Sequence, residues 1–417
     1  MSTGTDPTTG PDDRTSELEA RLARYPVDRY PVQHATTAFH LGTTHLQRGS
    51  LTQALRLVTD AHAIFNRLGM RLEQAKALTM KGVAEREAGQ LDPARHSFTR
   101  AVAAFGELDQ PAEQGAACFN LGLVLQEQHQ TALAQAAMAA ARGLFLQSGQ
   151  LAQAGAASRE QGAALLRSGH AEQALPLLTE ATRLAEHGGD LAGLGAAANV
   201  LGLAHLALNS PHDAIAALGR AVGAFPRSMR PAEHAMAKAN LATAYEQGGN
   251  PVRARLAARQ ARAIPDADPQ VLAQAQQVLD RLSGDAGPDL LAVLDAEPAD
   301  RWTAIVRDEA VRWCGVQPAE RLAAVGGFLD GLLGRPGAAY DVAESLLAVV
   351  LELPPEPYER LVTALVQATG SRDGDDRERL QALLGSAMAR FAIPQWQRLA
   401  GSLNAAAVDL GHDASWR

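Results

Sequence analysis

The residue types that could do chemistry are few in this sequence and are poorly spaced for it. Three histidines, His34, His40 and His45, lie near the N-terminus, but no two of them stand four residues apart, the spacing that places two imidazoles on one helix face. The glycine-containing segments do not have phosphate-loop spacing, and G-x-S-x-G, the sequence that presents a nucleophilic serine, does not occur. The sequence therefore predicts no catalytic residue, no metal ligand and no cofactor.

The remaining reactive side chains have simpler interpretations. Adjacent carboxylates, such as Glu85 with Glu87, are typical of solvated helix faces. Two cysteines are too few for a disulfide framework, and Cys118 is expected to be a small buried hydrophobe. We therefore expect a protein that is not an enzyme, and residues 289–417 are the one region in which an active site could be concealed.

Composition and charge exclude several classes of partner. The chain is 47% apolar but only 4% aromatic, which is typical of an alanine-rich, soluble helical protein. It has no apolar run long enough to span a membrane and no basic stripe for nucleic acid, and its net charge of −8 falls within residues 285–417. Residues 1–16 lack the features of a secretory signal and are expected to form a disordered tail, and a cytoplasmic location is expected.

A forty-residue repeat organises most of the chain. Glycine or alanine recurs at 42, 82, 122, 162, 202 and 242, and a second column of turn residues follows seven positions later. Alanine also fills two further columns in all six copies, from Ala54 and Ala61 onward. A period of this length predicts a solenoid in which each unit is a pair of helices joined by a short turn. Glycine inside a helix costs roughly 0.5–1 kcal/mol relative to alanine, so the first column is expected to mark close crossings of helices.

These columns resemble the tetratricopeptide repeat (TPR) over residues 34–265. The small residue, the alanine twelve positions later and the alanine seven beyond it match the family pattern, and the forty-residue unit is similar to the extended repeats of kinesin light chain and bacterial Rap-type sensors. The usual aromatic residue four positions before the glycine is absent, and Lys238 occupies that place in the sixth copy. The resemblance implies an all-α, right-handed superhelix over 17–284, with repeats near 33–72, 73–112, 113–152, 153–192, 193–232 and 233–270 and a closing helix at 271–282.

The resemblance also implies a binding groove, because first helices line the concave surface of TPR proteins. Asn120 and Asn240 stand where family members often use asparagine to hold a peptide backbone, but the other copies lack it, so no continuous ladder is expected. The mixture of apolar and basic positions suits an amphipathic helix, or a short peptide with one or two acidic anchors. The alternative is that Phe39 and Phe119 pack against neighbouring helices and that the arginines are simply solvated. The predicted groove residues are Phe39, Thr43, Leu46, Lys76, Thr79, Val83, Arg86, Phe119, Asn120, Leu123, Arg159, Arg167, Asn199, Leu203, Leu206 and Asn240.

Residues 285–417 are expected to form a separate helical domain of no recognised family. Apolar periodicity and prolines predict helices near 289–296, 301–313, 318–333, 340–352, 355–369, 376–391 and 394–408. Trp302, Trp313 and Trp396 indicate an aromatic core. The apolar stretch 343–362 predicts either a buried helix hairpin, which we favour, or a self-association surface that would make the protein a homo-oligomer.

The sequence therefore predicts a non-enzymatic scaffold or adaptor that binds another protein or a peptide. The alternative is a ligand-responsive regulator, in which a peptide or small molecule in the groove repositions the C-terminal domain. Pro176 lies inside a predicted helix of the fourth repeat, and two explanations remain open: sequence drift, or a joint at which the superhelix flexes.

Overall fold

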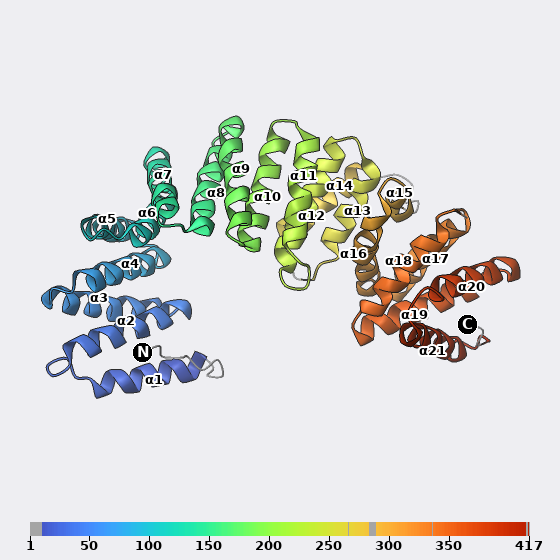
Figure 1. The fold of residues 1–417 in the computed structure, drawn as a ribbon, viewed down its shortest axis with the longest axis horizontal. Helices are drawn as coiled ribbons and strands as arrows, with labels where there is room; N and C mark the ends of the chain where they lie inside the picture. Colours follow the sequence, from blue (N-terminus) through green and yellow to red (C-terminus); the bar gives the residue numbers. More distant parts are fainter. Residues whose placement is uncertain (1–10, 266, 283–288, 336, 414–415, 417) are drawn as a thin grey trace. The chain divides into compact units, whose positions relative to one another are not determined.

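The computed structural model describes residues 11–265, 267–282, 289–335, 337–413 and 416 (Figure 1). These residues form α-helices, one 3-10 turn and no strand, so the all-α prediction is confirmed. The chain divides into two compact units, Met1–Ala204 and His205–Arg417, which we call unit 1 and unit 2. None of the helices in the described residues is long and apolar enough to cross a membrane.

Unit 1 is a stack of helices in which each helix packs against the next, from α1 to α9. The pairs α2–α3, α4–α5, α6–α7 and α8–α9 correspond to the first four predicted repeats. Its helices are α1 (Pro11–Arg24), α2 (Pro31–Gln47), α3 (Leu51–Arg67), α4 (Arg71–Glu87), α5 (Leu91–Glu107), α6 (Pro111–Glu127), α7 (Thr131–Gln147), α8 (Leu151–Arg167), α9 (Ala171–His187) and α10 (Leu191–Ala207), the last of which contains the division between the units.

The turn column owes its composition to backbone geometry. Gly49 and Gly89 both have φ of +73°, in the left-handed region, where a residue without Cβ meets no steric penalty. His129 and Asn209 fill the same column with φ of +59° and +54°, and these residue types are among those that tolerate this conformation best. Each first helix therefore ends at the same place in its repeat.

The in-helix glycines mark the predicted close crossings. A Cβ added to Gly162 on α8 would lie 2.6 Å from Cγ of Leu178 on α9, and one added to Gly42 on α2 would lie 2.7 Å from Cγ2 of Val58 on α3. Leu178 and Val58 are fully buried. The glycine lets a large side chain of the second helix press directly against the first helix, which offsets its poor helix propensity.

The first helix begins at residue 11, six residues before the predicted start of the solenoid at residue 17. α1 starts at Pro11, so residues 11–16 belong to a helix and not to the expected tail, whose residues 1–10 lie outside the described residues. Leu18 and Tyr25 stand forty positions before Val58 and Phe65, in the register of a second helix, and α1 packs against α2. This register was present in the sequence and would have identified α1.

The loop that follows α1 recurs five repeats later. Nδ1 of His34 lies 2.7 Å from the carbonyl oxygen of Tyr25, and Nδ1 of His234 lies 2.7 Å from that of Phe225. Each imidazole closes the irregular segment between an aromatic residue and the proline that begins the next helix. His34 therefore has a structural partner, as a buried or half-buried polar group usually does.

Pro176 does not interrupt its helix, because α9 runs from Ala171 to His187 through it. An interior proline removes one backbone hydrogen bond and crowds the preceding turn, at a cost of about 3 kcal/mol. Because Pro176 is exposed, alanine there would lose no packing. We expect Pro176→Ala to raise the free energy of unfolding of unit 1 by about 1–3 kcal/mol, measured by urea denaturation followed by far-UV circular dichroism.

Gln173→Ala, at an exposed position of the same helix, is the matched control and should change stability by less than about 0.5 kcal/mol. Unchanged stability in Pro176→Ala would show that α9 carries no strain at this proline, and the hypothesis of a strained joint would be abandoned.

Unit 2 contains the end of the repeat array and all the C-terminal helices. Proline is the first residue of six of the described helices of unit 2, a position where its missing N–H costs nothing. The elements are α11 (Pro211–Ala224), α12 (Pro231–Gln247), α13 (Pro251–Arg262), α14 (Pro269–Arg281), α15 (Asp289–Asp295), a 3-10 turn (Ala299–Arg301), α16 (Trp302–Gly315), α17 (Pro318–Leu333), α18 (Ala339–Glu352), α19 (Pro355–Gly370), α20 (Gly374–Met388) and α21 (Ile393–Asp409).

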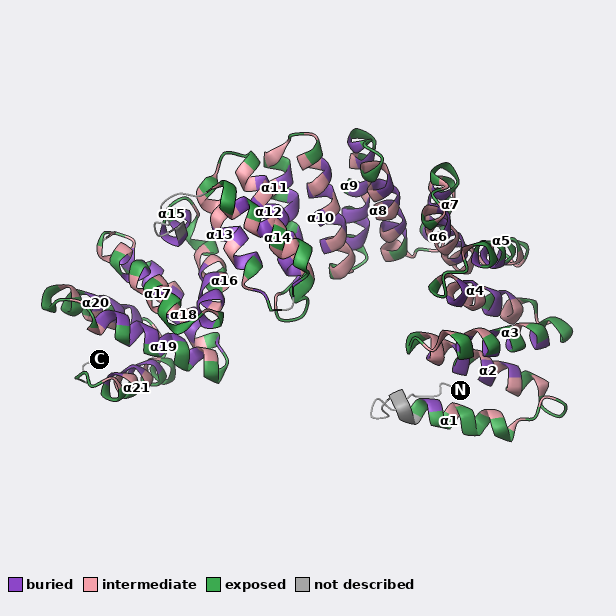
Figure 2. Ribbon diagram, turned by 180° about the vertical axis from the view of Figure 1, so that it is seen from behind, coloured by how far each residue is buried: buried purple, intermediate pink, exposed green. Residues whose placement is uncertain are grey.

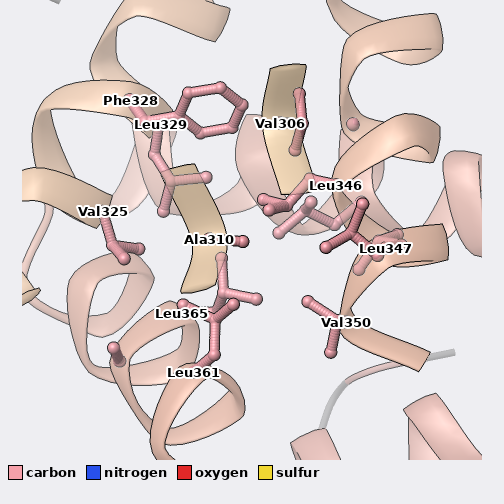
Figure 3. Packing of buried hydrophobic residues seen from close by; sticks show 14 of the residues in the cluster. Val306, Ala310, Val325, Phe328, Leu329, Leu346, Leu347, Val350, Leu361 and Leu365 are labelled. Atoms are coloured by element: carbon pink, nitrogen blue, oxygen red, sulfur yellow. The ribbon is translucent and has the colours of Figure 1, made fainter. Parts of the chain in front are cut away.

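The C-terminal helices match the seven predicted segments but pack in a different pattern from the repeats. α16 packs against α18 and α18 against α20, while α17 packs against α19 and α19 against α21. Apolar side chains of α16, α17, α18 and α19 meet between them, with Val306, Leu346 and Leu365 fully buried (Figure 3). Most apolar residues of segment 343–362 lie in this core, so the segment is buried as predicted, but α18 and α19 pack mainly against other helices and do not form the predicted hairpin.

The predicted domain boundary at 284/285 does not coincide with the division between the units. α13 of the sixth repeat packs against α15 and α16, and Leu256 on α13 joins the same apolar cluster as Val306 and Trp313. In earlier repeats the position of Leu256 is exposed and holds residues such as Arg56 and His96. A leucine in this outward column is the sequence signal that the C-terminal helices cover it.

Candidate binding face

The first helices of unit 1 contact one another directly, α2 with α4 and α4 with α6. Along them buried residues alternate with partly exposed ones (Figure 2). Thirteen of the sixteen predicted groove residues belong to unit 1 and are at least partly exposed, and we call them the first-helix face. They are Phe39, Thr43, Leu46, Lys76, Thr79, Val83, Arg86, Phe119, Asn120, Leu123, Arg159, Arg167 and Leu203.

The aromatic members of this face are shared between the core and the surface. Phe39 packs at the edge of the cluster that contains Leu41 and Phe65, and Phe119 packs against the cluster of Cys118 and Phe145. Both phenylalanines remain partly exposed. The alternative interpretation, in which they pack against neighbouring helices, therefore holds for part of each side chain, and the exposed part is available for contact.

The positive charges of the face fall into two groups. Arg86 pairs with Glu87 at 2.8 Å and with Glu127 of the next first helix at 3.6 Å, and Arg159 pairs with Glu160 at 2.8 Å. Lys76 and Arg167 are exposed and form no ion pair within the described part of the chain. The cations that a partner could neutralise are therefore chiefly Lys76 and Arg167.

The polar uncharged members of the face are bonded to their own helices. Thr43 and Thr79 donate their hydroxyl protons to the carbonyl oxygens of Phe39 and Ala75, and Asn120 donates its amide to that of Ala116 at 2.9 Å. The amide oxygen of Asn120 is then the group that can accept a hydrogen bond from a peptide N–H.

The structure corrects two groove predictions, Asn199 and Asn240, and places the partly exposed Leu206 in unit 2. Asn199 is only 3% exposed and Asn240 only 5%, so neither can reach a partner in this arrangement. The amide oxygen of Asn240 accepts a hydrogen bond of 2.9 Å from Gln274, because closing helix α14 covers this part of α12. Leu206 belongs to unit 2 and packs against the cluster of Leu218 and Leu241.

A buried ion pair in unit 2 was not predicted from the sequence. Lys238, in the helix-packing column, is 8% exposed; its Nζ lies 2.5 Å from Oδ2 of Asp308 on α16 and 2.8 Å from Oε1 of Gln260. Burial alone would raise the pKa of Asp308, but Lys238, His234 and Arg227 together hold it below its usual value. Arg253 and Glu297, 2.7 Å apart, form a second such contact between the sixth repeat and the C-terminal helices.

Reactive groups are sparse around these features. Burial raises the pKa of the Cys118 thiol to about 11, so the thiolate needed for nucleophilic attack is scarce at neutral pH. Among the described residues no group of three or more His, Cys, Asp or Glu side chains is arranged to hold a metal ion.

Comparisons with known proteins find structural relatives only. No protein-family model and no curated protein matches the chain. The apo form of RapI is 14% identical, with a TM-score of 0.49 over 87% of this chain and 99% of its own. A Rap protein complexed with competence and sporulation factor is 13% identical, with a TM-score of 0.38 over 88% and 99% of the two chains. Kinesin light chain TPR-like repeats from Podosopora anserina are 17% identical, with a TM-score of 0.36 over 50% and 97%. The chain is thus similar to Rap proteins and kinesin light chain repeats, the two kinds of extended TPR protein that its sequence resembles.

Proposed function

We propose that this protein is a non-enzymatic scaffold or adaptor whose first-helix face binds an amphipathic helix or short peptide of a partner protein. The observation that carries the proposal is the composition of that face. Eleven of its thirteen residues lie in four columns, which begin at residues 36, 39, 43 and 46 and over five repeats contain no aspartate or glutamate, and the charged residues of these columns are Lys76, Arg86 and Arg159. The columns of Asn120 and Arg167, the other two members, contain Glu160, Glu87 and Glu127. Partly exposed apolar side chains lie between these cations.

This composition defines the partner chemically. Apolar side chains of the partner would cover Phe39, Phe119 and Leu123, and one or two carboxylates would approach Lys76 and Arg167. A helix with acidic residues beside an apolar stripe meets both requirements, since an amphipathic helix presents its anchors three or four positions apart. Repeat solenoids commonly present such extended surfaces to partners.

A selection experiment tests this proposal directly. Helix-forming peptides from a randomised displayed library are selected on the full-length protein, and the affinity of the enriched peptides is measured by fluorescence polarisation. We expect the enriched sequences to combine apolar and acidic residues. The double variant Lys76→Glu, Arg167→Glu should bind them at least about tenfold more weakly, because carboxylates would then face carboxylates.

The matched control reverses the charge of two exposed arginines on second helices, with Arg56→Glu on α3 and Arg183→Glu on α9. It changes the net charge by the same amount and should leave affinity within about twofold. Equal loss in both double variants would mean that the effect is net charge and not the first-helix face. The variant Phe119→Ala, Arg159→Ala examines the apolar contribution, and unchanged binding there would place the site elsewhere.

The alternative function is a regulator whose C-terminal helices move when a ligand binds. Two ion pairs oppose such a movement. The ion pairs Lys238–Asp308 and Arg253–Glu297 join the sixth repeat to those helices within one unit. Repositioning them against that repeat would separate four partly or fully buried charges, and leaving such charges unpaired is costly. A change in radius of gyration by small-angle scattering on adding a selected peptide would favour the regulator over the scaffold.

A further inference from the structure

A cavity of about 300 Å³ lies in unit 2 between the sixth repeat and the C-terminal helices. α11, α12 and α13 form one wall, and α15, α16 and the turn before α16 form the other. The apolar part of its lining includes Val222, Leu241, Leu256 and Ile305. Its volume is at the lower end of the range for ligand pockets, which suits a small organic molecule.

The charged lining of this cavity has an excess of cations. Lys238, Arg253 and Arg301 face it from three elements, and the carboxylates there are those of Asp308 and Glu297. Lys238 is paired with Asp308, and Arg253 is paired with Glu297 at 2.7 Å. Arg301, with 69% of its side chain exposed, has only a longer contact of 3.6 Å to the same Glu297. Two carboxylates therefore face three cations. One positive charge at the mouth is therefore not neutralised within the cavity.

Arg253 is held in place at the wall of the cavity. Nε of Arg253 is buried and has no hydrogen-bond acceptor in the described part of the chain. This nitrogen is buried too deeply for a ligand oxygen to reach it, so a ligand carboxylate would approach Arg253 through the rest of its guanidinium, which lines the cavity. The guanidinium of Arg253 also lies 5.7 Å from the ring centroid of Tyr245, which fixes its position at the wall.

We propose that this cavity binds a small organic carboxylate, with its apolar body between Leu241, Leu256 and Ile305 and its carboxylate near Arg253 and Arg301. The inference is independent of the first-helix face, which belongs to the other unit. An ammonium ligand is disfavoured because both carboxylates already have cationic partners. A larger cavity of about 630 Å³ is lined by residues that include Leu279 and Leu290, and because residues 283–288 between them lie outside the described residues, no proposal is based on it.

The test compares probes that differ only in their charged group. The full-length protein is titrated with 4-phenylbutanoate, 4-phenylbutan-1-ol and 4-phenylbutylamine, together with phenylacetate and octanoate as a shorter and a more flexible acid. Binding is measured by ligand-observed NMR and calorimetry. We expect at least one of the acids to bind, and 4-phenylbutanoate to bind more tightly than its alcohol and amine counterparts.

Two variants place the binding in this cavity. Ala304→Trp, at an exposed lining position of α16, should fill the mouth and weaken binding more than about tenfold. Arg301→Gln should weaken binding of the acids by about threefold and leave the alcohol unchanged. Arg307→Gln, which removes an exposed arginine of the same helix that does not line the cavity, is the control and should change nothing.

Three results would overturn the proposal. They are failure of all three acids to bind the wild type, equal or tighter binding of the amine, and binding that survives Ala304→Trp unchanged. Far-UV circular dichroism checks that this variant is folded, because the substitution itself adds a tryptophan and changes the fluorescence.

Discussion

Replacing Asp308 with alanine is expected to lower the free energy of unfolding of unit 2 by about 3 kcal/mol. The variant leaves the ammonium of Lys238 buried with only the amide oxygen of Gln260 as a partner, and a buried charge without its counter-ion is strongly destabilising. The measurement is urea denaturation followed by tryptophan fluorescence, which reports on unit 2 alone because Trp302, Trp313, Trp396 and Trp416 all lie there.

Glu352→Ala is the matched control, because it removes a carboxylate from an exposed pair on the neighbouring surface. Glu352 lies 2.7 Å from Arg307, and the two side chains are 55% and 45% exposed. Such pairs contribute at most about 1 kcal/mol. If Asp308→Ala costs no more than Glu352→Ala, the Lys238 contact does not hold the C-terminal helices to the sixth repeat.

A double variant separates the pairing from the individual residues. When Lys238→Met accompanies Asp308→Ala, neither charge of the pair remains and Arg227 still donates to the carbonyl oxygen of Ala263, so the loss should be smaller than that of Asp308→Ala alone. Lys238→Met alone should cost less than Asp308→Ala alone, because Asp308 would still face Arg227 and His234. Additive losses would show that the two side chains are not coupled.

The pH dependence of this difference follows from the lowered pKa of Asp308. Burial opposes ionisation of Asp308, but Lys238, His234 and Arg227 outweigh it, so the folded state holds the carboxylate charged more strongly than the unfolded state does. A depressed carboxyl pKa stabilises the folded state above its ordinary value of 3.8, and this stabilisation disappears as the pH falls through the lower folded value. The difference between wild type and Asp308→Ala should therefore be constant near neutral pH and diminish in acid below about pH 4.

The repeats could be predicted because each structural requirement occurs several times in the sequence. The turn column needs left-handed backbone at Gly49 and Gly89, and the crossing column needs the absence of a side chain at Gly42 and Gly162. Because such local requirements recur every forty residues, they can be recognised in the sequence before any contact is known. The C-terminal helices were visible for a different reason, since prolines such as Pro318 and Pro355 stand at their first positions.

The contacts specific to unit 2 could not be predicted in this way, because each occurs once and joins residues far apart in sequence. Lys238 stands out as a charge in a column of small residues, but its partner Asp308 is seventy positions away and nothing in the spacing identifies it. Asn240 fits the family's peptide-binding position, and only the path of α14 shows that Gln274 occupies it instead. Leu256 and Tyr25 could have been interpreted from the sequence. Leu256 is apolar in a column that is exposed in earlier repeats, and Tyr25 stands forty positions before Phe65.

Replacing Gly162 with valine is expected to destabilise unit 1 by about 2 kcal/mol. Even a methyl group at this position would lie 2.6 Å from Cγ of Leu178 and 3.4 Å from the carbonyl oxygen of Ala174, and Leu178 has no free space because it is fully buried. Overpacking of this kind costs about 1–3 kcal/mol, which exceeds the few tenths of a kcal/mol that valine gains over glycine in helix propensity. The far-UV circular dichroism transition should shift to lower urea while the tryptophan fluorescence transition stays in place, because unit 1 contains no tryptophan.

Two comparisons decide whether the crossing itself causes this loss. Gly143→Ala, at an exposed helical position where an added Cβ would meet nothing within 4 Å, should instead stabilise unit 1 by about 0.5–1 kcal/mol. Leu178→Ala removes three carbon atoms and Gly162→Val adds three, so the double variant conserves volume at the crossing and should lose less stability than the two single variants combined. If both glycine variants stabilised the protein equally, α8 and α9 would not need a glycine between them, and the first column of the repeat would require another explanation.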